Sequence, residues 1–312
     1  MRRRSFLWAF PLVLCVYFVG CLPGMKLGTG KPHIVCTTTL VADLAKAIGK
    51  EFVEVDCLMG PQIDPHRYQP SAGDLDKLSS AKLVLYHGLH LEGKMTDVLE
   101  HNPKLHAVAI TKDLPRKELL RGMVDGGEYD PHVWFDLDLW TRCAETVHDA
   151  MYAEFPEHRI VFDANYKMLL GIFNNLNKEL DEQVKTLPKE RRILVTSHDA
   201  FGYFGRKYGF EVFGLQGVST SAESGTNDIT QLADVIGKRK VPAIFTETSV
   251  PPKGLQRVLD EVKNKYQLPV NLIGDAEALY SDALGEKGSP GETYPGLMRA
   301  NMGTIVKALS VK

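Results

Sequence analysis

Short apolar runs alternate with segments of helical periodicity from residue 33 onward. In the first half of the chain, this pattern predicts strands over 33–37, 52–59, 81–86 and 105–110, and helices over 40–49 and 71–80, the latter with Ser71 as its N-cap. A second set follows, with strands over 193–196, 211–213, 243–246 and 269–272 and helices over 229–238 and 254–266. Such alternation is typical of βαβ units and parallel sheets.

A single long helix is predicted between the two sets. Apolar residues from Phe162 to Leu187 recur mostly three or four positions apart, and Pro188 ends the pattern. A helix over 160–187 would span about 40 Å at 1.5 Å per residue. We therefore predict an α/β protein with two Rossmann-like lobes, each with a mostly parallel sheet, joined by one long rigid helix. The predicted divisions are 32–158 for the N-terminal lobe, 159–188 for the helix and 189–312 for the C-terminal lobe.

The N-terminal segment has the pattern of an export signal. Three arginines at 2–4 precede an uncharged run over 6–20, which is shorter than the roughly 20 residues of a membrane-spanning helix. Phe18-Val19-Gly20-Cys21 resembles a bacterial lipobox, with Phe18 in place of the usual leucine. We predict a signal peptide over 1–20, lipidation of Cys21 and a flexible tether over 21–31. The mature protein would be exported, and either lipid-anchored at the outer face of the cytoplasmic membrane or periplasmic.

Composition narrows the class of protein further. The 312 residues carry 37 basic and 39 acidic side chains, so no basic excess points to nucleic acid as a partner. Five cysteines are too few for a disulfide scaffold. Cys36 and Cys57 fall on neighbouring predicted strands, where we expect two buried small hydrophobic residues. A disulfide between them is the alternative in an oxidising compartment.

Three of the ten histidines lie in turn-rich segments that suit a ligand site. His66 and His132 each end an Asp-Pro-His tripeptide, and His198 lies in Thr-Ser-His-Asp. Proline restricts its own backbone and that of the residue before it, which favours a preorganised imidazole. His66 and His198 directly follow predicted strands, where open α/β sheets bind ligands. His87 and His90 could also chelate a metal, but we expect structural roles for them.

Carboxylates close to these histidines could complete a divalent metal site. Three aspartates are candidates to hydrogen-bond the imidazoles and set their tautomers: Asp64, Asp130 and Asp199. Three acidic residues in C-terminal turns are candidates for a fourth ligand: Glu247, Asp275 and Asp282. Spacing alone does not choose among these three.

Several long motifs resemble the metal-binding lipoproteins of bacterial zinc/manganese ABC importers, most closely the TroA-type members. The similarity extends from Ile34 nearly to the C-terminus and includes LMGPQIDPHRYQPSAGD, EYDPHVWFDLDLW, ILVTSHDAFGYFGRKYGFEVFGLQGVST and LYSDALGEKGSPGETYPGLM. The resemblance implies four metal ligands, two from each lobe, in the interlobe cleft: His66, His132, His198 and Asp282. Glu247 then joins the candidates for a hydrogen bond to an imidazole.

The resemblance also implies a function. Members with histidine at the position of His198 bind zinc or both metals, so we expect Zn²⁺ with Mn²⁺ also accepted, and Irving–Williams order favours zinc. The chain would be a monomeric, non-enzymatic binding protein that delivers the metal to an ABC permease served by a separate ATPase. Two alternatives remain: an exported zinc metallohydrolase with Glu247 as base, which needs an open metal position, and a surface adhesin.

Overall fold

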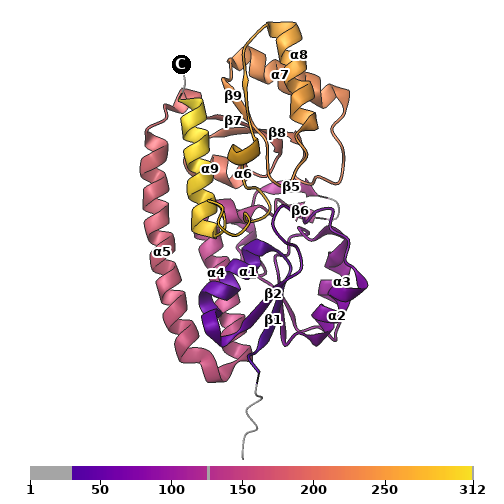
Figure 1. Ribbon diagram of the computed structural model, residues 1–312, viewed down its shortest axis with the longest axis vertical. Helices are drawn as coiled ribbons and strands as arrows, with labels where there is room; N and C mark the ends of the chain where they lie inside the picture. The colour runs from indigo at the N-terminus through magenta and orange to yellow at the C-terminus, as the bar shows by residue number, and fades with distance from the viewer. Residues whose placement is uncertain (1–29, 125–126, 311–312) are drawn as a thin grey trace, which may run out of the picture. The chain divides into compact units, whose positions relative to one another are not determined.

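The computed structural model describes residues 30–124 and 127–310 (Figure 1). The predicted signal peptide over 1–20, the lipidation site Cys21 and nearly all of the tether lie outside the described residues. Among the residues that are described, no helix is both long enough and apolar enough to cross a bilayer. The chain from Pro32 onward forms one compact unit.

The first half of this unit contains a parallel sheet with strand order β2-β1-β3-β4. Its strands are β1 (His33–Cys36), β2 (Glu54–Cys57), β3 (Leu83–Tyr86) and β4 (Ala107–Ala109). The intervening helices are α1 (Thr39–Gly49), α2 (Ala72–Ser80) and α3 (Thr96–His101). Helix α2 begins with the predicted cap, since Ser71 and Asp74 form a reciprocal capping box.

Helices cover both faces of this sheet. Successive residues of a strand point to opposite faces, so they pack against different helices. Ile34 and Cys36 belong to the large core that includes α1 and α4 (Leu137–Glu154). Val35, between them, packs instead with residues of α2 and α3. Strand β3 is buried throughout and β1 in all but His33, so both appear in the sequence as nearly continuous apolar runs.

A second parallel sheet has strand order β10-β9-β7-β8. Its strands are β7 (Ile193–His198), β8 (Glu211–Gln216), β9 (Ala243–Phe245) and β10 (Asn271–Ile273). Its helices are α6 (Gly202–Tyr208), α7 (Thr226–Arg239) and α8 (Lys253–Tyr266). Ile193 and Val195 pack against α7 and α8 in a separate core. The two parallel sheets confirm the predicted α/β class.

The predicted long helix is α5 (Arg159–Lys185), which has 27 residues and follows α4 in the chain (Figure 1). It packs against α1, α4 and the C-terminal helix α9 (Tyr294–Leu309). Helices α4 and α9 were not among the predicted elements. The antiparallel hairpin of β5 (Arg121–Val124) and β6 (Gly127–Tyr129) was not predicted either.

One hydrophobic core connects the two sheets. It contains Ile34 of β1, Leu194 of β7 and Tyr294 at the start of α9. The Tyr294 hydroxyl donates to the Trp134 carbonyl oxygen at 2.6 Å, and the Tyr294 N–H donates to the Asp43 carboxylate at 3.3 Å. Residues of the second half are thus tied to the first half, and the division into lobes at 159–188 stays a prediction.

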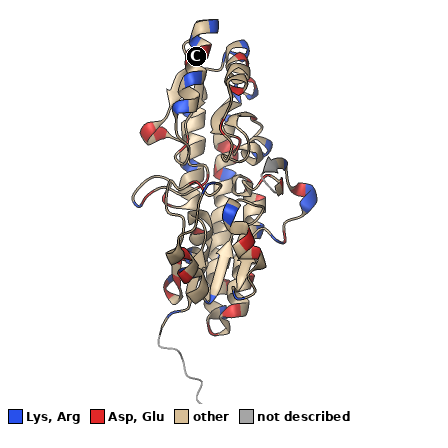
Figure 2. Cartoon of the chain, turned by 90° about the vertical axis from the view of Figure 1, so that its right-hand side faces the viewer, with Lys and Arg blue, Asp and Glu red and all other residues tan. Residues whose placement is uncertain are grey.

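Cys36 and Cys57 are register partners on β1 and β2, and both are free thiols. Cys36 is buried as predicted, whereas Cys57 is only partly buried against the same core. Desolvation raises the pKa of Cys57 to about 11. Acidic and basic residues are interspersed along the chain (Figure 2).

Candidate metal centre

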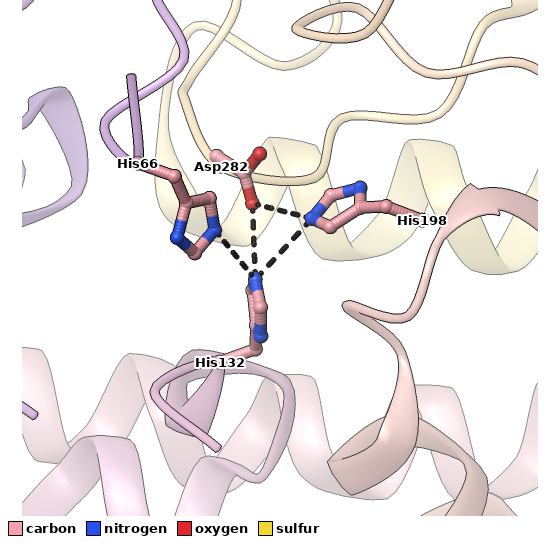
Figure 3. A group of neighbouring side chains, drawn as sticks. All are labelled: His66, His132, His198 and Asp282. Carbon is pink, nitrogen blue, oxygen red and sulfur yellow. Dashed lines mark hydrogen bonds and ion pairs between the residues drawn. The ribbon is translucent and has the colours of Figure 1, made fainter. Parts of the chain in front are cut away.

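Three histidines and one aspartate converge at a buried point between the two sheets (Figure 3). His66 lies in the loop after β2, and His132 lies between β6 and α4. His198 is the last residue of β7, and Asp282 lies in the segment that leads to α9. All four side chains are almost completely inaccessible to solvent. The fold therefore brings together residues that are up to 216 positions apart (282 − 66).

Four of the six separations among the ligand atoms match the edges of a small tetrahedral site. Nε2 of His132 lies 3.3 Å from Nε2 of His66 and 3.3 Å from Nε2 of His198. Oδ1 of Asp282 lies 3.4 Å from Nε2 of His132 and of His198. All four atoms lie within 4.8 Å of one another. Zinc bonds of about 2.0–2.1 Å give a regular tetrahedron with edges of roughly 3.4 Å.

The two Asp-Pro-His tripeptides fold in the same way. In each, the aspartate carboxylate accepts the N–H of the histidine two residues later at 2.9 Å, from His66 to Asp64 and from His132 to Asp130. This is the turn that a short acidic side chain forms with its own backbone. It directs both histidines inward from loops that contain no regular helix or strand.

Two of the imidazoles have a carboxylate next to Nδ1, the ring nitrogen that does not face the proposed metal position. Nδ1 of His132 lies 2.7 Å from Oδ1 of Asp130. Nδ1 of His198 lies 2.5 Å from Oε2 of Glu247, whose other oxygen accepts the His198 N–H at 2.9 Å. Such pairs fix the tautomer, leave Nε2 free to bind a cation and increase its basicity.

His66 has a different environment. Its Nδ1 is buried and has no hydrogen-bond partner among the described residues. Asp64 binds the backbone of His66 instead, and its second oxygen accepts the Thr220 hydroxyl at 2.5 Å. Asp199, the remaining candidate partner, is close enough to His132 and His198 to influence them electrostatically, but the described structure contains no hydrogen bond from its carboxylate to either ring.

Asp282 is held by residues that the sequence did not indicate. Ser249 donates to Oδ2 of Asp282 at 3.0 Å, and the Trp134 indole N–H donates to the neighbouring Ser281 carbonyl at 2.9 Å. Trp134 lies two residues after His132 and Ser249 two residues after Glu247, so closeness to a candidate residue is the only signal in the sequence.

Burial and charge act in opposite directions on these groups. Burial lowers the pKa of His66 to about 3, so this ring is neutral. Burial disfavours the charged form of His132 as well, but Asp130 and Asp282 outweigh it and raise its pKa to about 9. Although burial alone would raise the pKa of Asp282, the nearby His198 and His132 hold it well below the usual range. Without a cation, the carboxylates are therefore compensated by protons on His132 and His198.

The other candidates lie away from this centre. Asp275, considered as a fourth ligand, is exposed. His87 and His90 do not form a chelating pair, since His87 is buried and donates from Nε2 to the Pro131 carbonyl at 2.7 Å. His90 lines a separate surface pocket beside Glu100.

Comparisons with known proteins agree with this arrangement. The family described as "Zinc-uptake complex component A periplasmic" (ZnuA) matches residues 34–308. The chain is 41% identical to the manganese-binding lipoprotein MntA of Bacillus subtilis, with 89% of each protein covered. It is 40% identical to the zinc-binding protein TroA of Treponema pallidum, with 95% of this chain and 97% of TroA covered. The solved structure of that TroA superposes with a TM-score of 0.84, covering 90% of this chain and 99% of TroA.

Proposed function

Because this chain belongs to the ZnuA family of periplasmic zinc-uptake components, we propose that it captures a divalent metal ion outside the cytoplasm and delivers it to an ABC importer. The ligands would be Nε2 of His66, His132 and His198 together with Oδ1 of Asp282. The observation that supports this assignment most directly is the set of 3.3–3.4 Å separations among these atoms.

The preferred metal in this proposal is Zn²⁺, with Mn²⁺ also accepted. Three imidazoles and one carboxylate suit a borderline cation, whereas Ca²⁺ and Mg²⁺ prefer oxygen ligands. Relatives of nearly equal similarity carry either metal in their names, since MntA is manganese-binding and TroA is zinc-binding. The four separations of 3.3–3.4 Å favour zinc, because zinc sites closed by protein ligands have four-coordinate geometry.

The family consists of binding proteins rather than enzymes. A catalytic zinc keeps one coordination position for water or substrate. Here Asp282 lies at the fourth corner, and Glu247, the base in the hydrolase alternative, lies against the back of His198. The names of the relatives reported above give no support to the adhesin alternative.

Family membership implies an ABC permease with its ATPase as the partner, and a location outside the cytoplasm. We further propose that Cys21 is lipidated after removal of residues 1–20 and that the mature protein is a lipid-anchored monomer. The name of MntA as a lipoprotein supports the anchor. Labelling with a radioactive fatty acid in the wild-type chain and in Cys21→Ala tests it, and equal labelling of both would contradict it.

Metal titration tests the ligand assignment. The purified protein should bind one equivalent of Zn²⁺, measured by competition with a chromophoric chelator. His132→Ala should lower the affinity by several kcal/mol, in the range of about 3–5 kcal/mol for a buried charged network that loses a member. His106→Ala is the matched control, because His106 is half exposed and pairs only with Glu154 at the surface. Wild-type affinity in His132→Ala would refute the assignment.

A further inference from the structure

The peptide group that precedes His132 is held at both of its ends. Its N–H, on His132, donates to Asp130 at 2.9 Å. Its carbonyl, on Pro131, accepts from Nε2 of His87 at 2.7 Å. Hydrogen bonds at both ends restrict the tilt of this planar group, and its position sets where the backbone enters the Cα of His132.

Aromatic side chains in the protein interior hold the His87 ring where it contacts the Pro131 carbonyl. Its ring is completely buried, lies edge-on to Trp134 with centroids 5.2 Å apart and stacks on Trp140 at 6.3 Å. Its own carbonyl accepts the Thr111 hydroxyl at 2.7 Å. Burial lowers the pKa of His87 to about 3, so the ring is neutral and donates from Nε2 without carrying a charge.

A buried carboxylate fixes the loop that carries His87. Oε1 of Glu92 accepts the His87 N–H at 2.6 Å and the Thr37 hydroxyl at 2.8 Å, and Oε2 accepts the Gly88 N–H at 3.1 Å. Glu92 is 1% exposed, and none of these three donors belongs to a proposed metal ligand. An ionisable group this deep in a protein is costly unless several donors satisfy it, as they do here.

The same loop also touches His66. Gly93 has a positive φ of 47°, and a Cβ on it would lie 2.6 Å from the His66 carbonyl oxygen. Two residues of the loop, Leu89 and His90, adopt the left-handed conformation, with φ of 54° and 61°. Backbone strain of this kind persists where the surrounding structure requires it and is concentrated at functional sites. The 87–93 loop thus supports both ligands from the first half of the chain.

We propose that His87, held in place by Glu92, is a positioning residue for metal binding: through the Pro131 carbonyl it holds the His132 imidazole in its binding orientation. This role rests on the proposed function. Without the Nε2 donor, the Pro131 carbonyl keeps only the Val133 N–H, at 2.7 Å and from within its own turn. The turn is then no longer tied to the 87–93 loop, and the His132 ring samples orientations that do not bind. Partners one step removed from a metal typically change affinity by about 10–100-fold.

A pair of similar side chains isolates the hydrogen bond from packing. Gln and Met are both unbranched and of similar length, but only His87→Gln presents a donor that can reach the Pro131 carbonyl. His87→Met should bind Zn²⁺ about 10–100-fold more weakly than the wild type. His87→Gln should restore most of the loss. Co²⁺ provides the second readout, because its visible absorption bands report the geometry of the ligands, and they should shift in His87→Met and not in His87→Gln.

Several outcomes would overturn the proposal. One is an affinity of His87→Met within about threefold of the wild type together with unchanged Co²⁺ bands. Another is an equal loss of Zn²⁺ affinity in His87→Met and His87→Gln when the two variants have the same thermal stability. That result would indicate that the packing of His87, and not its hydrogen bond, affects metal binding. The exposed control His101→Phe should leave both readouts unchanged. If the wild type binds Zn²⁺ and His132→Ala does not, but His87→Met binds normally, this inference fails and the proposed function stands.

Glu92→Gln is the second variant, should His87→Met fail to fold. The amide oxygen of the new glutamine can still accept from Thr37 and His87. Its NH₂ group then faces the Gly88 N–H, and two donors cannot form a hydrogen bond with each other. We expect weaker Zn²⁺ binding and shifted Co²⁺ bands. Wild-type affinity and bands in this variant would contradict the role of the loop.

Discussion

The hydroxyl of Ser249 donates to Oδ2 of Asp282 at 3.0 Å, so that only Oδ1 faces the three imidazoles. Ser249 also contacts the Ser281 hydroxyl at 2.8 Å, which holds it in position. A carboxylate tied in this way binds a cation through one oxygen. It therefore favours the four-coordinate geometry of zinc over the larger oxygen-rich shell that manganese prefers.

Ser249→Ala should shift the metal preference towards manganese. Loss of the hydroxyl frees Oδ2 of Asp282 to bind as a second carboxylate oxygen. We expect the ratio of Mn²⁺ to Zn²⁺ affinity to rise by about tenfold, in the range of effects from residues one step removed from a metal. Competition titrations with both metals measure this ratio. An unchanged ratio would show that Oδ2 does not control coordination number. Ser79→Ala serves as the control, because Ser79 is an exposed residue of α2.

Zinc affinity should decrease as the pH falls. The nearby carboxylates raise the pKa of His132 to about 9 against the effect of burial, so a proton competes with the metal at every pH below that value. Each displaced proton costs about tenfold in affinity per unit of pH. Because His132 and His198 both hold a proton in the metal-free site, the loss between about pH 7.5 and about pH 5.5 should be about 10⁴-fold. Competition titrations corrected for protonation of the chelator measure it. The same affinity at both pH values would contradict the prediction.

His66→Ala should cost less zinc affinity than His198→Ala. Glu247 lies against Nδ1 of His198 and increases the basicity of that ring, whereas Nδ1 of His66 has no partner in the described structure. We expect a difference of about tenfold between the two variants. Calorimetry on both, together with circular dichroism to verify folding, provides the comparison. A larger loss in His66→Ala would reverse the ranking.

Asp43→Asn should stabilise the metal-free protein at neutral pH but not in acid. Burial raises the pKa of Asp43 from 3.8 to about 6. Its contribution to stability is therefore complete below about pH 4 and is lost as the pH rises through about 6. Asn keeps an oxygen for the Tyr294 N–H and carries no charge. We expect a gain of about 1–2 kcal/mol above about pH 7 and almost none near pH 4.

Urea unfolding at the two pH values measures this difference. Asp113→Asn is the control, because Asp113 is exposed and pairs only with Lys112 at the surface. It should change stability by less than about 0.5 kcal/mol at either pH. An equal effect of Asp43→Asn at both pH values would show that the charge on Asp43 is not what destabilises the folded state.

Periodic patterns accounted for most of the fold. The apolar runs of β1 and β7 and the long helix α5 were visible because each buries a regular set of side chains. Helix α4 has the same kind of pattern, with Leu137, Trp140, Ala144, Val147 and Met151 buried, yet it was not among the predicted elements. The hairpin of β5 and β6 is short and irregular, and its residues show no alternation that distinguishes it from a loop.

The four proposed ligands were predicted from residue type and family resemblance. Most of the hydrogen bonds around them could not be predicted from the sequence. The hydrogen bond of Thr220 to Asp64 joins residues 156 positions apart, and that of His87 to the Pro131 carbonyl joins residues 44 apart. Single polar residues at such separations leave no periodic signal. Their roles depend on how the two sheets are placed, which local pattern does not specify.

The hydrophobic core that joins the two sheets limits how an ion could leave. Separating the halves would expose apolar side chains such as Leu194 and Tyr294 and break the bond from Tyr294 to Trp134. Displacing the segment over 60–66 exposes far less. That segment is tied across the site by two side-chain hydrogen bonds, from Thr220 to Asp64 and from Gln62 to Glu286. Residence time of the bound ion should therefore depend on these two hydrogen bonds more than on the core between the sheets.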